Sequence, residues 1–147
     1  MFMVTWQIVL LASYTALSGV FLATGLVQCR RGHAYGRFLP LNLIGAFVWG
    51  DAVVFGLFWV VASSVILLYG SWWLFLIVFD AFWLVRSIGE TIYWLNQQYS
   101  TLDRNPPRQL WFYPIFRNNS VWFVYQTFWQ CISVITLILL LVLWRQL

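Results

Sequence analysis

Long apolar stretches separated by short polar segments dominate this chain. Four of them cover residues of about 4–27, 38–69, 72–95 and 121–144. Each has at least the ~20 mostly apolar residues that a helix needs to cross ~30 Å of hydrocarbon. The apolar residues are continuous and do not alternate with polar ones, which favours transmembrane helices over barrel strands. The pattern predicts an all-α integral membrane protein, with residues 1–147 forming one four-span domain.

The connection between the second and third spans is very short. Gly70 can take the left-handed conformation that ends a helix, and Ser71 can cap the next helix. Because almost no linker separates these spans, we expect them to form a tight antiparallel hairpin within a four-helix antiparallel bundle. Pro40 suits the first turn of the second span, where a missing N–H costs little.

The composition supports a membrane protein and argues against a nucleic-acid-binding one. Hydrophobic residues make up 63% of the chain and charged residues only 8%, against about 25% charged in soluble proteins. The net charge is +4, and every cationic residue except the single His is Arg. These arginines are few and lie mostly in the loops between spans, so they form no basic face.

Basic residues also predict the orientation of the chain. Loop 28–37 and loop 96–120 fall on the same side of a four-span protein, and six arginines lie in them: Arg30, Arg31, Arg37, Arg104, Arg108 and Arg117. The positive-inside rule places both loops in the cytoplasm and both termini outside, in a cell inner or plasma membrane. No basic residue precedes the first span, so we expect a retained span rather than a signal peptide.

Loop 96–120 is the only sizeable segment outside the predicted spans. It combines three prolines with a dense group of aromatic residues, namely Trp111, Phe112, Tyr113 and Phe116. Aromatic rings interleaved with arginines suit a segment that lies at the lipid headgroups. The alternative is a lid, or a docking surface for a cytoplasmic partner.

Four ionisable residues fall inside the predicted spans: Asp51, Asp80, Arg86 and Glu90. Such groups are costly in hydrocarbon and normally pair, face the bundle interior or line a water-filled path. Arg86 and Glu90 are four residues apart, the spacing at which helical side chains meet. In the predicted hairpin Asp51 lies level with Glu90, so Arg86 could contact both carboxylates.

Asp80 has no basic partner within reach in the sequence. A carboxyl group near mid-membrane that can take up and release a proton is what a proton relay requires. On the last span, Gln126 and Gln130 share a face with Ser133 and could hydrogen-bond to the charged residues or across helices. These polar residues can either lock helix packing or form a site for a proton, an ion, a headgroup or a small solute.

Small residues also recur on two spans. The second span carries Gly45, Ala52, Gly56 and Ser63 on one face, and the first carries Tyr14, Ser18 and Gly25. Small side chains let another helix approach closely, so both stripes predict helix contacts.

No set of residues predicts catalysis, a metal or another cofactor. His33 and Cys29 are four apart but have no further ligand beside them, and the spans have no histidine pair for haem. We therefore expect a non-enzymatic subunit, or an assembly or accessory component of a membrane complex, with a membrane protein partner or a second copy. The alternative is a small oligomeric proton- or ion-coupled transporter or channel. A lipid-modifying enzyme is weaker, since only Glu90, Asp103 and His33 could serve it.

Overall fold

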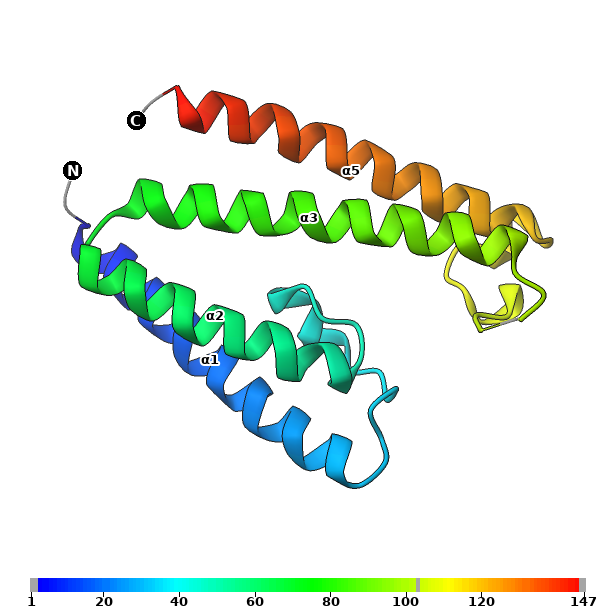
Figure 1. Ribbon diagram of the computed structural model, residues 1–147, viewed down its shortest axis with the longest axis horizontal. Helices are drawn as coiled ribbons and strands as arrows, with labels where there is room; N and C mark the ends of the chain where they lie inside the picture. Colours follow the sequence, from blue (N-terminus) through cyan, green and yellow to red (C-terminus); the bar gives the residue numbers. More distant parts are fainter. Residues whose placement is uncertain (1–2, 103, 146–147) are drawn as a thin grey trace. The chain divides into compact units, whose positions relative to one another are not determined.

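The structure, a computed structural model, describes residues 3–102 and 104–145 and is helical over most of this range. Its long helices are α1 (Thr5–Arg30), α2 (Trp49–Tyr69), α3 (Trp72–Tyr99) and α5 (Ser120–Trp144) (Figure 1). Three short helices lie between them: η1 (Leu39–Ile44), η2 (Pro107–Gln109) and α4 (Tyr113–Phe116). All four long helices are long and apolar enough to cross a membrane. The prediction of an all-helical chain with four helices of that kind is confirmed.

The chain divides into two compact units, and the boundary follows Val78 within α3. The first unit contains α1, η1, α2 and the first turns of α3. The second contains the rest of α3, η2, α4 and α5. The helix packing within each unit is described separately below.

In the first unit, α1 and α2 pack as an antiparallel pair. A Cβ atom on Gly56 of α2 would lie 3.0 Å from the Cβ of Leu22 and 3.1 Å from its backbone N. At the other end of the pair, the Met3 N–H donates to the Gly70 carbonyl over 3.0 Å. Between these points, the Thr15 hydroxyl lies 2.7 Å from the hydroxyl of Ser63. The helices are therefore in backbone contact, which only a residue without a side chain permits at position 56.

The predicted stripes of small residues make this contact, with one exception. Ala52, Gly56 and Ser63 are buried on α2, and Ser18 and Gly25 are buried on α1. Gly45 was predicted to extend the stripe on the second span, but it precedes α2 and has a φ of 74°. Its left-handed conformation ends η1, so its role is to turn the chain rather than to admit a helix.

The second span starts later than predicted. We expected a helix from residue 38, but α2 begins at Trp49, and residues 38–48 contain η1 and an irregular return. Pro40 lies in the first turn of η1, not of α2, and the left-handed Gly45 interrupts any continuous helix. Arg37 and Val48 form an antiparallel bridge that closes the base of this segment.

Segment 38–48 turns back along the helix pair instead of extending it (Figure 1). The Trp59 indole N–H donates to the Ile44 carbonyl over 3.2 Å, and the Tyr14 hydroxyl donates to the Leu43 carbonyl over 3.2 Å. Trp59 lies about 15 Å along α2 from its start, at ~1.5 Å per residue. The tip of the segment therefore lies near the middle of α2, where the two side chains hold its backbone carbonyls.

The turn between α2 and α3 has the local geometry that the sequence predicts. Gly70 has a φ of 64° and ends α2, and the Ser71 side-chain oxygen accepts from the Leu74 N–H over 3.3 Å. The antiparallel packing of α2 against α3 stays a prediction.

The second unit is built on α3 and α5 and is closed at one end by residues 100–102 and 104–119. An aromatic and aliphatic cluster of Trp94, Leu110, Val121 and Trp122 is buried there. The Trp122 indole N–H donates to the Asn105 carbonyl over 3.0 Å, which ties the loop to α5. Trp111 and Ile115 point outward, with 87% and 73% of their surface exposed. The position of the loop at the lipid headgroups stays a prediction. The exposed Trp111 and Ile115 side chains could enter the lipid interface there.

We expect Gly56→Ala to lower the free energy of unfolding by about 1–3 kcal/mol, the usual cost of overpacking a tight contact. The new methyl group must push Leu22 and its helix away. Thermal unfolding in detergent micelles measures the effect.

Gly89→Ala is the matched control, because a Cβ there meets nothing within 4 Å. It should be neutral or slightly stabilising, since Ala favours helix over Gly by about 1 kcal/mol. Equal effects of the two substitutions would contradict the close α1–α2 contact.

Candidate functional site

Arg86 and Glu90 form an ion pair on α3, as their spacing predicts. Arg86 Nη1 lies 2.6 Å from Glu90 Oε1, and the two side chains are 15% and 12% exposed. A buried charge whose partner is removed is strongly destabilising. Each residue therefore supplies the counter-charge that allows the other to occupy this apolar helix.

Glu90 also holds the next aromatic residue along α3. Its second oxygen accepts from the Trp94 indole N–H over 3.2 Å. The Trp94 ring stacks on Tyr125 of α5, with ring centres 4.6 Å apart. The Tyr125 hydroxyl accepts from the Trp111 backbone N–H over 3.2 Å. A continuous series of contacts thus runs from the ion pair to the loop that closes the unit.

Asp51 lies in the first unit, in the first turn of α2. Its carboxylate accepts from the Phe47 N–H over 3.2 Å, and a negative charge in the first turn is favoured by the helix dipole. It therefore stabilises the return of segment 38–48 into α2. The predicted contact between Asp51 and Arg86 would join the two units and stays a prediction.

Asp80 is buried, with 8% of its surface exposed, in the part of α3 that belongs to the second unit. Its Oδ2 atom has no hydrogen-bond partner among the described residues. Nearly all buried polar atoms in proteins are hydrogen-bonded, so an exception needs an explanation. At this position a proton, a cation or water could provide the missing interaction.

The two glutamines of α5 differ in their partners. Gln126 accepts from Gln98 of α3 over 2.6 Å, and Gln98 also donates to the Trp94 carbonyl. Ser133, on the same side of α5, lies 2.9 Å from the hydroxyl of Ser87. These bonds join α3 to α5. Gln130 is exposed and makes no hydrogen bond with any described residue.

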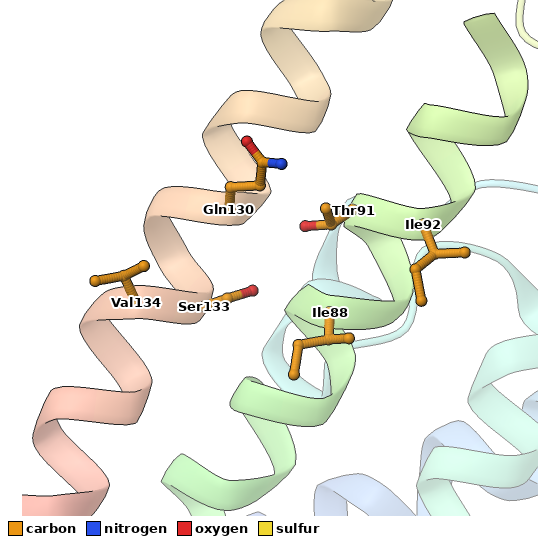
Figure 2. A pocket seen from close by; sticks show the side chains of 6 residues that line it. All are labelled: Ile88, Thr91, Ile92, Gln130, Ser133 and Val134. Carbon is orange, nitrogen blue, oxygen red and sulfur yellow. The ribbon is translucent and has the colours of Figure 1, made fainter.

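Gln130 lies between two shallow grooves. The first has a volume of about 390 Å³ and runs between α3 and α5, lined by Ile88, Thr91, Ile92, Gln130, Ser133 and Val134 (Figure 2). Figure 2 shows Gln130 and Ser133 on α5 opposite Thr91 on α3. The second groove, about 400 Å³, is lined by α5 alone, through Thr127, Gln130, Cys131, Val134 and Ile135. Gln130 and Val134 border both grooves and so form a ridge between them.

Several contacts of this site were not expected from the sequence. Glu90 and Trp94 are four residues apart, so their hydrogen bond could have been found by the same spacing rule as the ion pair. The stacking of Trp94 on Tyr125 could not, because the two residues belong to different helices. Nor did the sequence indicate that Tyr14 and Trp59 bind backbone carbonyls of segment 38–48.

Within residues 3–102 and 104–145, no group of three or more His, Cys, Asp or Glu side chains could hold a metal ion. Asp103, one of the residues considered for lipid chemistry, lies outside the described residues. Comparisons with protein-family models, curated proteins and solved structures find no match to this chain.

We expect Arg86→Gln and Glu90→Gln to destabilise the protein non-additively, with a coupling energy of about 0.5–3 kcal/mol. Each substitution alone leaves a charge without its counter-charge, whereas the double variant removes both. Thermal or denaturant unfolding of the three variants in micelles gives this energy.

The cycle formed by Asp51→Asn and Arg86→Gln tests the contact predicted from the hairpin in the same assay. Additive effects of Asp51→Asn and Arg86→Gln would rule out a contact between Asp51 and Arg86. Additive effects of Arg86→Gln and Glu90→Gln would contradict the ion pair in α3.

Proposed function

We propose that this protein is a non-enzymatic integral membrane subunit, or an assembly or accessory component of a membrane complex. The observation that carries the proposal is the exposed Gln130 amide, which has no hydrogen-bond partner among the described residues. Gln130 lies about 15 Å from the start of α5, at ~1.5 Å per residue, and so near the middle of a ~30 Å hydrocarbon layer.

An amide at that depth has no water to bind. Polar side chains such as Gln hydrogen-bond across helices in membranes and contribute to helix association. The grooves on either side of Gln130 provide room for the side chains of another helix. The surface around Gln130 is therefore suited to a second membrane helix rather than to lipid alone.

The charged residues of the second unit support the same proposal. Arg86 and Glu90 are paired, and Glu90 also holds Trp94, which packs against α5. This series of contacts fixes the helices and the closing loop. The contacts therefore give the ion pair a structural role. They give less support to a lipid-modifying enzyme that uses Glu90, since both carboxylate oxygens of Glu90 already have partners.

The proposal includes a topology. The four helices form an antiparallel bundle in which α2 and α3 make the hairpin, and both termini lie outside the cytoplasm. Loops 28–37 and 96–120 are cytoplasmic, as the distribution of arginines favours. Trp111 and Ile115 then anchor the second loop in the interface.

Asp80 favours a second candidate, a small oligomeric transporter or channel coupled to protons or ions. Its buried Oδ2 atom lacks a donor among the described residues, as a protonatable site at membrane depth would. Segment 38–48 adds to this, because irregular backbone at membrane depth is tolerated only inside protein or beside a water-filled cavity.

We expect the wild-type protein, gently extracted from its own membrane, to carry a stoichiometric second chain in native mass spectrometry, either another membrane protein or a second copy of this chain. Gln130→Leu should reduce the bound fraction at least severalfold, because it removes the amide while keeping an apolar side chain of similar size. Phe128→Leu, on the opposite face of α5, is the control and should retain the partner. A wild-type protein that is always monomeric would contradict the proposal.

For the transporter alternative, we expect Asp80→Asn to fold normally and to abolish proton or ion flux in proteoliposomes, since the amide cannot release a proton. Flux is followed with a pH-sensitive dye trapped inside, and protein-free liposomes give the background. Asp80→Glu should retain part of the flux. Normal flux through Asp80→Asn would exclude Asp80 as a relay.

A further inference from the structure

We propose that the partner bound at Gln130 is a second copy of this chain, and that two α5 helices cross at this residue. The inference rests on the proposed function, because it names the partner at the same surface. It is carried by two features of α5, the ridge between two grooves and the chemistry of the amide, and the spacing of the exposed residues agrees with it.

The exposed residues of α5 include a heptad stripe that runs the length of the helix. Positions separated alternately by three and four residues are all exposed: Ser120, Phe123, Thr127, Gln130, Val134, Leu137, Leu141 and Trp144. A repeat of 3.5 residues places one continuous seam along a helix that supercoils with a partner. The preferred crossing angle of such pairs is about +20°.

The shape of the same face is self-complementary. Gln130 and Val134 form a ridge at i, i+4, and grooves of about 390 and 400 Å³ lie on its two sides. Helices pack when the ridge of one enters a groove of the other. Two copies related by a two-fold axis each present a ridge and a groove to the other, which is the arrangement that a symmetric dimer needs.

The amide favours a second copy over an unrelated helix. In the proposed topology every copy crosses the membrane in the same orientation, so Gln130 of each copy lies at the same depth. A glutamine amide has both a donor and an acceptor, and can therefore bond to its own equivalent across a two-fold axis. Gln130 is the one amide in this stripe, and an amide in a mostly apolar seam also fixes register, because sliding leaves both amides unpaired.

The test uses disulfide formation between copies in native membranes. Both natural cysteines are first changed to serine, at Cys29 and Cys131, and a single cysteine is then introduced as Val134→Cys or as Phe128→Cys. The two sites are similarly exposed, 56% and 45%, but only position 134 lies on the stripe. With copper–phenanthroline as oxidant, we expect a covalent dimer from Val134→Cys and at least tenfold less from Phe128→Cys.

Adding Gln130→Leu to the Val134→Cys chain should reduce the dimer severalfold, and Gln130→Asn should restore part of it. If the leucine variant fails to fold, the comparison of positions 134 and 128 decides alone. Equal dimer at both positions would show random collision and overturn the proposal. The absence of a covalent dimer from Val134→Cys would also overturn the proposal. In that case a different protein, lipid or another part of the same chain covers Gln130.

Native mass spectrometry separates this failure from failure of the proposed function. A stoichiometric partner of different mass that is lost with Gln130→Leu would overturn the second copy and leave the subunit role intact. A wild-type monomer with neither partner would overturn both.

Discussion

Polar groups on a helix that crosses a membrane have little water to bind, and this constraint accounts for several of the side-chain contacts of the chain. Arg86 and Glu90 pair within α3 at 2.6 Å. Gln98 and Gln126 pair between α3 and α5, as do the hydroxyls of Ser87 and Ser133. Each pair removes an unmet polar group, and the last two pairs do so where α3 and α5 join. The polar groups of these two pairs, which would be costly alone, therefore fix the register in which α3 and α5 meet.

Irregular backbone obeys the same constraint in the first unit. Segment 38–48 has few of the regular hydrogen bonds of a long helix, yet it runs back to the middle of α2. The indole of Trp59 and the hydroxyl of Tyr14 bind its carbonyls, and Asp51 binds the Phe47 N–H. Asp51 is thus connected to the backbone of its own unit, which gives this carboxylate a local structural role beside any longer-range one.

The second unit shows how one ion pair can organise a larger surface. Glu90 holds Trp94, Trp94 stacks on Tyr125, and Tyr125 binds the loop that covers the end of α3 and α5. Once these contacts are made, the unsatisfied polar atoms of this unit include the Oδ2 atom of Asp80 and the amide of Gln130. They differ in setting, since Asp80 is buried and Gln130 is exposed beside two grooves. That difference is why the first suggests a proton or ion and the second suggests a neighbouring helix.

The sequence by itself determined the four long helices, the turn at Gly70 and Ser71, the Arg86–Glu90 pair and the close approach at Gly56. All of these depend on apolar length, on local conformational preference or on the repeat of a helix, which are properties of nearby residues. It misplaced the start of the second span, because the apolar residues of 38–48 look alike in a helix and in a segment packed against one. Only the tertiary structure decided that Trp59 and Tyr14 hold this segment, that Trp94 stacks on Tyr125, and that Gln126 is paired while Gln130 is not. These depend on contacts between residues far apart in the chain, and the spacing of residues within one helix carries no information about which helix lies beside it.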